Sequence, residues 1–453
     1  MTPPPPADNP QANRRTPFLC SARNDYLPSM NPTRTLATAA ALALGAAALP
    51  AQTAPATHSR QAAAILRDIR YLASDSLDGR LTGSPQNDSA AAYLARRFKL
   101  LGLKPGGDAG TYLQHWTVNS TSGTREAAVA NRATENVVGI LPGGDRTLAG
   151  QDIVIGAHFD HLGNGPFGSA AHGDSVHLIH HGADDNASGT AGVLEIARIL
   201  AGRRPRPART IVFVLFSGEE EGALGSAWYA DHPAIPMDST LAMLNLDMVG
   251  RMRANRLLVL GALSATEWQP LLDSVDAPYH LEVHASGSGW GPSDQNSFFA
   301  KQRPVLHFFT DLHTDYHAPA DTWEKINADG IETVARLVAD LASRLAVRRA
   351  PLTFVNAPPP VMASGERAYL GSIPDMTSEP GGVKLSGVTA GSPAEAGGLK
   401  AGDVITAIGA DSVTSLADMQ NALVKHHPGD KVDITVRRGD QTVTLPVTLG
   451  RRQ

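Results

Sequence analysis

Side chains of the kind that bind metal ions follow directly after three apolar segments of this sequence. They are His158 after segment 152–157, the glutamates 219–221 after segment 210–217, and Asp247 after segment 241–246. In an open sheet of parallel strands, ligands bind beyond the carboxyl ends of the strands. A mixture of imidazole and carboxylate ligands suits zinc. We therefore expect these side chains to meet at one edge of a sheet and to hold metal.

Two further segments add ligands of the same kinds. Asp184 and Asp185 stand at the start of an expected helix, where the helix dipole favours negative charge. Tyr316 and His317 lie in an expected loop before Asp321. Each motif alone is common, because a single aspartate at a strand end is usually a turn or capping residue. Their joint occurrence at one sheet edge favours a metal site.

The elements that must position these residues alternate between apolar strands and helices. Helices are expected at 60–73, 84–101, 188–200, after 221 and at 331–347, and strands at 136–141, 152–157, 210–216, 241–246, 257–260 and 305–309. Continuous apolar strands alternating with helices indicate a mostly parallel sheet buried on both faces. The predicted fold class is therefore α/β, with a mostly parallel mixed sheet sandwiched by helices.

A second, smaller domain is expected at the carboxyl end of the chain. Residues 350–364 are proline-rich and read as a linker, so the larger α/β domain is expected to span 57–349. The remainder, 365–453, contains short apolar segments at 383–388, 404–408, 431–437 and 442–448, and one expected helix at 415–425. This pattern predicts a small β-rich module.

Residues 1–56 are expected to form a leader absent from the mature protein. After a spurious or low-complexity start, Met30 begins a signal-peptide pattern: Arg34, the apolar stretch 36–49, and a cleavage point at Ala51 or Ala56. The stretch is shorter than the roughly 20 residues that span a bilayer. We therefore expect a secreted or periplasmic bacterial protein without a transmembrane anchor after cleavage.

The overall composition excludes several classes of protein. Cys20 in this leader is the one cysteine of the chain, which excludes disulfides and thiolate catalysis in the mature protein. Apolar residues make up 42% of the sequence and charged residues 18%, a balance typical of a globular protein with a buried core. The formal net charge of −5 provides no basic field for nucleic acid.

The segments AHFDH, GADDNASG, SGEEEGALGS, NLDMVG and YHAPADT resemble the two-zinc exopeptidases that include secreted bacterial leucyl aminopeptidases and, more distantly, glutamate carboxypeptidases. The resemblance covers roughly residues 60–348. It implies two Zn²⁺ ions bridged by Asp185, with His158 and Asp247 completing one site and Glu220 and His317 the other. It also implies a cis peptide bond after Asp185.

The same resemblance implies three catalytic roles. Glu219 would be the general base, and Asp160 would accept a hydrogen bond from the ring of His158. Tyr316 would donate to the oxyanion of the tetrahedral intermediate, with simple aromatic packing as the alternative. Three carboxylates and two neutral imidazoles suit a pair of dications, and fewer than four protein ligands on each leave the open position of catalytic zinc.

Several histidines lie between the first two motifs. We interpret His161, His172, His177, His180 and His181 as loop histidines, with a ligand to a third metal or a residue lining the substrate cleft as the alternative. Sequence spacing does not choose between these interpretations.

Residues 366–450 resemble a PDZ domain of the kind attached to exported bacterial proteases. The segment AYLGS, 368–372, would form the loop that binds a peptide carboxylate. Leu370, Gly371, Ser372 and Ile373 are the expected peptide-binding residues. The alternative is a domain that only stabilises or orients the enzyme.

The sequence thus predicts an exported zinc metallopeptidase that removes N-terminal residues from peptides. One alternative is a carboxypeptidase or a glutaminyl-cyclase-like enzyme on the same scaffold. An alternative of another class is a non-catalytic peptide-binding protein. The partners expected are peptide substrates and a C-terminal peptide in the PDZ groove.

Overall fold

A computed structural model describes the chain between residues 58 and 451. The described residues are 58–118, 129–165, 168–171, 173–357, 368–375, 381–414, 416–423 and 425–451. The expected leader, with Cys20 and the signal peptide from Met30, lies outside them. None of the helices in the described part of the chain is long and apolar enough to cross a membrane.

The larger, N-terminal region is built on a sheet that contains nine strands among the described residues. In spatial order these are β1 (Lys104–Pro105), β3 (Ala133–Leu141), β5 (Thr210–Phe216), β4 (Asp152–His158), β6 (Thr240–Leu246), β9 (Val305–Phe309), β7 (Arg256–Leu260) and β8 (Glu282–Ser286), with β2 (Leu113–Thr117) also paired to β3. The predicted mixed sheet is confirmed. Its centre, from β5 through β4 and β6 to β9, is parallel. Strand β3 runs antiparallel to β5, and β7 runs antiparallel to β9 but parallel to β8.

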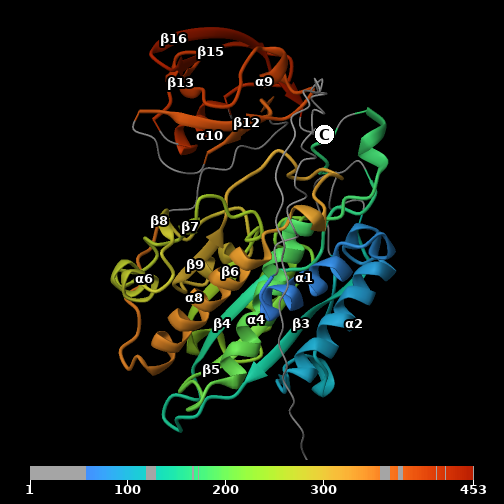
Figure 1. The fold of residues 1–453 in the computed structure, drawn as a ribbon, viewed down its shortest axis with the longest axis vertical. Helices are drawn as coiled ribbons and strands as arrows, with labels where there is room; N and C mark the ends of the chain where they lie inside the picture. Colours follow the sequence, from blue (N-terminus) through green and yellow to red (C-terminus); the bar gives the residue numbers. More distant parts are fainter. Residues whose placement is uncertain are drawn as a thin grey trace, which may run out of the picture. The chain divides into compact units, whose positions relative to one another are not determined.

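Helices cover both faces of this sheet (Figure 1). The α-helices of this region are α1 (Arg60–Leu72), α2 (Pro85–Leu100), α4 (Gly189–Gly202), α5 (Leu224–Asp231), α6 (Trp268–Asp276), α7 (Gln295–Ala300) and α8 (Ala328–Val347). Short helical turns are η1 (Asp75–Arg80), η2 (Asp108–Gly110), η3 (Gly173–His177), η4 (Ala183–Ser188), η5 (Met237–Ser239) and η6 (Trp323–Lys325). The Ser84 hydroxyl caps α2 by accepting from the amide of Asn87, as its sequence predicts.

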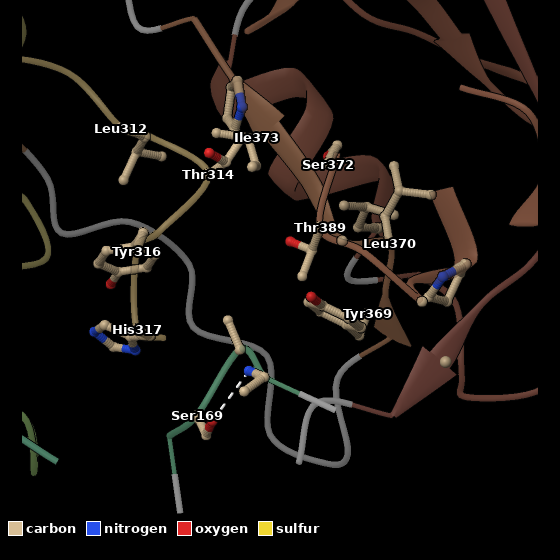
Figure 2. A pocket seen from close by; sticks show the side chains of 18 of the residues that line it. Ser169, Leu312, Thr314, Tyr316, His317, Tyr369, Leu370, Ser372, Ile373 and Thr389 are labelled. Carbon is tan, nitrogen blue, oxygen red and sulfur yellow. Dashed lines mark hydrogen bonds between the residues drawn. The ribbon is translucent and has the colours of Figure 1, made fainter. Parts of the chain in front are cut away.

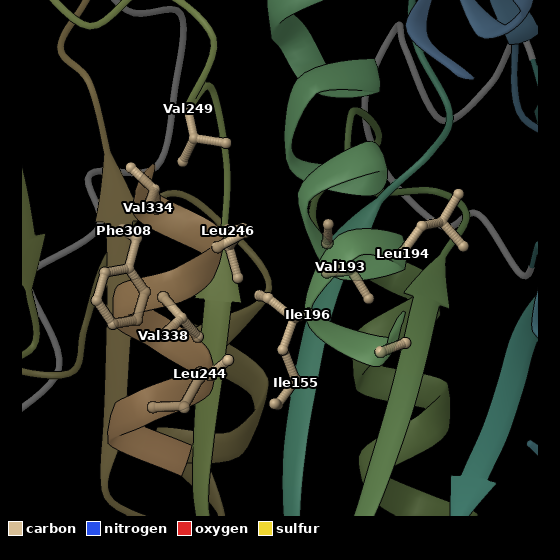
Figure 3. Packing of buried hydrophobic residues seen from close by; sticks show 14 of the residues in the cluster. Ile155, Val193, Leu194, Ile196, Leu244, Leu246, Val249, Phe308, Val334 and Val338 are labelled. Carbon is tan, nitrogen blue, oxygen red and sulfur yellow. The ribbon is translucent and has the colours of Figure 1, made fainter. Parts of the chain in front are cut away.

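The two faces of the sheet bury alternate residues of each strand. On β4, Ile153 and Ile155 belong to the core beneath α1, α4 and α8, and Val154 belongs to the core beneath α5 and α7. Figure 3 shows Ile155 beside Ile196 of α4, and Phe308 of β9 beside α8. These strands are apolar on both faces because helices exclude water from both sides. The sheet is therefore a rigid base for the loops at its carboxyl edge.

The C-terminal region forms a β-rich domain with its own core. Its strands are β10 (Ala368–Tyr369), β11 (Ser372–Pro374), β12 (Val383–Val388), β13 (Val404–Ile408), β14 (Asp411–Ser412), β15 (Lys431–Arg438), β16 (Gln441–Thr448) and β17 (Gly450–Arg451), and its helices are α9 (Pro393–Ala396) and α10 (Leu416–Leu423). Strand β11 is at one end of the sheet order β11-β12-β13-β15-β16. Leu385, Ile405, Ile434 and Val447 are buried in the centre of this domain.

The first part of the expected linker contacts the larger, N-terminal region. Phe354 forms an isolated β-bridge with Ala265, and the indole of Trp290 donates to the carbonyl of Ala357 at 2.8 Å. Leu352 is buried in the main core. The proline-rich segment therefore begins as part of the larger, N-terminal region, at least as far as residue 357.

Candidate metal centre

The parallel strands deliver the expected ligands to one edge of the sheet. His158 is the last residue of β4, and Asp247 directly follows β6. Glu219 and Glu220 follow β5 after Gly218, which turns the chain with a φ of +82°. Strand β4 pairs in parallel with both β5 and β6, so the three strand ends lie side by side. The side chains converge because of strand direction, although they are far apart in sequence.

His158, Asp185 and Asp247 form the first group of side chains able to hold a metal ion. The Nε2 atom of His158 lies 3.3 Å from Asp185 Oδ1 and 3.4 Å from Asp247 Oδ1. All three residues are buried. This is the set expected for the first metal.

The second group consists of His161, Asp185 and Glu220, so it shares Asp185 with the first and contains a histidine that was not expected as a ligand. The expected ligand His317 contacts the same two carboxylates. The Nε2 atom of His317 lies 3.1 Å from Asp185 Oδ2 and 3.2 Å from Glu220 Oε2. On another side of the group, His161 Nδ1 lies 2.7 Å from Glu220 Oε1 and 4.0 Å from Asp185 Oδ2. Asp185 thus presents one oxygen to each group. The sequence placed His161 among the loop histidines.

The chemistry of these atoms fits cations. His158 Nε2, Asp247 Oδ1 and both ring nitrogens of His161 are buried and make no hydrogen bond within the described residues. Buried polar atoms are almost always hydrogen-bonded, and buried charges are paired or bind metal. Three carboxylates and three imidazoles facing one another therefore have the composition of a metal site.

Asp160 is hydrogen-bonded to the loop that carries Glu219, the expected base. Its carboxylate accepts the amides of Glu219 at 3.3 Å and Glu220 at 3.2 Å, and the hydroxyl of Thr82 at 3.1 Å. The ring nitrogen Nδ1 of His158 is 3.6 Å from this carboxylate and 3.3 Å from the Asp160 backbone carbonyl. The carboxylate thus fixes the loop that carries the two glutamates, and the carbonyl is the nearer acceptor for the imidazole.

Asp321 holds the loop around Asp185 in place by hydrogen bonds to its backbone. One oxygen of Asp321 accepts the amides of Asp184 at 2.9 Å and Asp185 at 3.1 Å. The side chain of Asp184 is directed elsewhere, since it accepts the Gly250 amide at 2.6 Å and contacts His313 at 3.1 Å. The peptide bond between Asp185 and Asn186 is cis, as the family resemblance implies.

Arg80 is a buried cation that sequence reasoning missed. It is 0% exposed, and its guanidinium donates to the carbonyls of Leu72, Phe159, His181 and Gly182. Burial lowers its pKa to about 10, although nearby carboxylates such as Asp160 oppose this change. Phe159 follows one metal-site residue and Gly182 precedes the loop of another. No local pattern marks Arg80, because all but one of its partners lie far along the chain.

Glu219 lies beside the two groups without belonging to either. Burial raises the pKa of its carboxyl well above the usual range; His158 opposes this shift, whereas Glu220, Asp247 and Asp294 reinforce it. Tyr316 stacks on His317, with ring centroids 3.9 Å apart. The expected base and the expected oxyanion donor are therefore both adjacent to metal-site residues.

A cavity of about 510 Å³ borders this site and the expected peptide groove. Figure 2 shows Tyr316 and His317 across the cavity from Tyr369 and Leu370. Gly371, Ser372 and Ile373 also line it, as do Met419 and Leu423 of α10. All four residues expected to bind peptide thus face one hollow.

Comparisons with known proteins define the two domains. The sequence model of peptidase family M28 matches residues 136–342, and that of the PDZ domain matches residues 368–449. The chain therefore carries an M28 peptidase domain followed by a PDZ domain.

Curated relatives match separate parts of the chain. Aminopeptidase YwaD of Bacillus subtilis is 29% identical over 223 residues, which are 47% of this chain and 44% of that protein. The serine protease Do-like HtrA of Lactococcus lactis is 45% identical over 75 residues, 17% of this chain and 18% of that protein. The chain thus spans less than half the length of either relative.

Solved structures share the fold. A Zn-dependent exopeptidase from Parabacteroides distasonis has a TM-score of 0.51 at 18% identity, covering 62% of this chain and 97% of that chain. A glutaminyl cyclase from Porphyromonas gingivalis has a TM-score of 0.52 at 17% identity, covering 63% of this chain and 98% of that chain. The structures that share this fold thus include an exopeptidase, as predicted, and a glutaminyl cyclase, the alternative enzyme.

Proposed function

We propose that this chain is an exported zinc aminopeptidase that uses two metal ions. The observation that carries the proposal is the shared carboxylate of Asp185, which faces His158 on one side and His317 on the other at distances of 3.3 and 3.1 Å. A carboxylate between two ligand groups is what a pair of adjacent dications requires. The M28 domain and the aminopeptidase relative support the same activity.

Some of these residues would bind the metal ions, and Glu219 would transfer protons. His158, Asp247, Glu220 and His317 would hold two zinc ions with Asp185, and the ions would activate water and polarise the substrate carbonyl. Glu219 would take the proton of the attacking water and pass it to the leaving amine. Burial raises the pKa of its carboxyl, which makes the carboxylate a stronger proton acceptor than an exposed glutamate.

Two neighbours would support that chemistry. Asp160 would hold the loop of Glu219 and Glu220 in place through the two amide hydrogen bonds. Tyr316, stacked on His317, would direct its hydroxyl to the oxygen that gains charge in the transition state. Removal of one such donor typically costs about 10²–10³ in kcat.

We propose that the PDZ groove binds the C-terminal end of a peptide. Strand β11 ends the order of its described sheet, so a peptide can pair with its outer edge. Leu370, Ile373, Met419 and Leu423 give the cavity beside this edge an apolar lining suited to a terminal side chain. The amides of Gly371 and Ser372 would face the carboxylate.

Bound zinc and product analysis on the purified protein test the proposed activity. We expect close to two zinc ions per chain and release of free amino acid from aminoacyl anilides. One zinc ion per chain, with cyclisation of N-terminal glutamine, would instead identify a glutaminyl-cyclase-like enzyme. Release of C-terminal residues would identify a carboxypeptidase, and two zinc ions without any turnover would favour a peptide-binding protein.

We propose that residues 1–56 form the leader and that the mature chain is exported. Amino-terminal sequencing of the protein secreted by a bacterial host tests this proposal. A start at residue 52 or 57 is expected, and an intact leader on exported protein would contradict it.

A further inference from the structure

The surroundings of His161 differ from those of a histidine that only packs in a protein core. It is 0% exposed, and neither of its ring nitrogens makes a hydrogen bond within the described residues. An unsatisfied buried polar atom costs about 1–3 kcal/mol. By contrast, the equally buried His180 has an acceptor or donor at each nitrogen, namely Leu178 at 2.9 Å and Ser169 at 2.7 Å.

The direction of the His161 ring is the second observation. Its Nδ1 lies 2.7 Å from Glu220 Oε1, while the other oxygen of this carboxylate, Oε2, lies 3.2 Å from His317 Nε2. The ring meets His317 edge to face, with centroids 5.8 Å apart. A nitrogen lone pair and a carboxylate oxygen this close are stabilised when both face one cation.

The backbone leaves room for this ring. Gly182, immediately before the Asp185 loop, has a φ of +56°, and a Cβ atom there would lie 2.6 Å from the His161 ring. The amide of His161 donates to the carbonyl of Arg80 at 3.3 Å. The ring therefore packs against the segment that leads into the Asp185 loop, and the backbone of His161 is held by Arg80.

We propose that His161 is a fourth protein ligand at the second metal position, together with Asp185, Glu220 and His317. The proposal rests on the two-metal function above. It gives the two metal positions different numbers of protein ligands, four at the second and three at the first. Four protein ligands are typical of closed zinc sites, and three of sites that keep a position for water or substrate. The second position should therefore hold its ion tightly, and the first, at His158 and Asp247, should exchange it.

Zinc affinity measured by chelator competition on the full chain tests the assignment. The wild-type protein should bind zinc in two steps, and His161→Ala should weaken the tighter step by about 100-fold, since even partners of ligands contribute about 10–100-fold. His180→Ala, the matched buried control, should leave both steps unchanged. Two unchanged steps in folded His161→Ala would overturn the inference, whereas a wild-type protein with one zinc site would overturn the two-metal proposal itself.

A spectroscopic variant gives an independent reading. In cobalt-loaded His161→Cys, a thiolate-to-cobalt charge-transfer band in the near ultraviolet is expected only if residue 161 contacts the metal. Wild-type protein, whose single cysteine is Cys20, provides the baseline. A variant that binds two cobalt ions without this band would contradict the assignment. If the Cys variant does not fold, the affinity of His161→Ala decides.

Discussion

Glu219 differs from its neighbours in what surrounds its carboxyl group. Glu220 contacts two imidazoles, and Glu221 accepts a hydrogen bond from Thr82 at 2.7 Å. Glu219 instead stands next to the metal site with a raised pKa. We expect Glu219→Gln to keep zinc and lose about 10²–10⁴ in kcat, the usual contribution of a general base. Aminoacyl-anilide kinetics and zinc analysis of the same sample measure both.

Glu221→Gln is the matched control for this variant, because a glutamine can still accept from Thr82. Its kcat should stay within a few-fold of the wild type. Asp185→Asn should lose zinc, since a neutral amide replaces the carboxylate shared by both groups. Normal peptide hydrolysis by Glu219→Gln would show that another residue is the base.

Asp152 provides a test of charge burial far from the chemistry, at the opposite end of β4. Burial raises its pKa from 3.8 to about 7, although the hydroxyl of Thr240 donates to it at 3.0 Å. The folded protein therefore binds a proton between pH 4 and 7 that the unfolded chain releases. The destabilisation is full above about pH 7 and disappears as the pH falls towards 4.

Asp152→Asn should consequently stabilise the protein at pH 8, by at most roughly 4 kcal/mol at about 1.4 kcal/mol per pH unit. The gain should shrink as the pH is lowered to 5.5. Urea unfolding of variant and wild type at each pH measures the difference. Asp238→Asn, at an exposed site, should change stability by no more than about 0.5 kcal/mol. A gain independent of pH would contradict the assigned cause.

At the scale of elements, the sequence predicted those strands and helices whose positions follow from local patterns of apolar residues. The expected strand 210–216 coincides with β5, and His158 and Asp247 end or follow apolar strands whose direction places them together. The edge strand β8 and the six-residue helix α7 were missed because β8 is partly exposed and α7 is short. Sequence reasoning also missed the proximity of His161 to Glu220, which depends on how two loops far apart in sequence turn towards each other.

Arg80 joins several elements, so its replacement should affect more than one of them. Arg80→Met would leave four carbonyls, from the end of α1 to the loop before η4, without their donor. We expect a loss of about 3–5 kcal/mol in unfolding free energy, since each bond to a charged donor contributes about 1.5–3 kcal/mol and partial rearrangement recovers some. Zinc retention should fall in parallel, because Phe159 and Gly182 flank metal-site residues.

Chemical denaturation and dialysis against a weak chelator measure these two effects. Arg336→Met is the control, because Arg336 itself is exposed and pairs with Glu332 one turn away on the same helix, α8. Such a pair contributes about 0.3–0.5 kcal/mol. Equal, small losses in both variants would show that Arg80 does not connect the elements.

At the scale of the whole molecule, the boundary between the two domains determines how their roles can be separated. A deletion that begins at residue 351 removes Leu352 from the main core and the bridge between Phe354 and Ala265. A stop after Ala357 keeps these contacts and still removes the PDZ domain. The second cut is therefore the cleaner test of what the PDZ domain contributes.

Chains ending at residue 357 should hydrolyse dipeptide-sized substrates nearly as well as the full chain, because the metal-site residues all precede the cut. Longer peptides with a free carboxyl end should show a higher KM, because their C-terminal end has lost the groove at Leu370 and Ile373. Amidated peptides of the same sequence are the control, since they lack the terminal carboxylate and should respond little to the deletion. Equal losses on dipeptides and longer peptides would mean that the PDZ domain supports the fold of the enzyme and does not select its substrates.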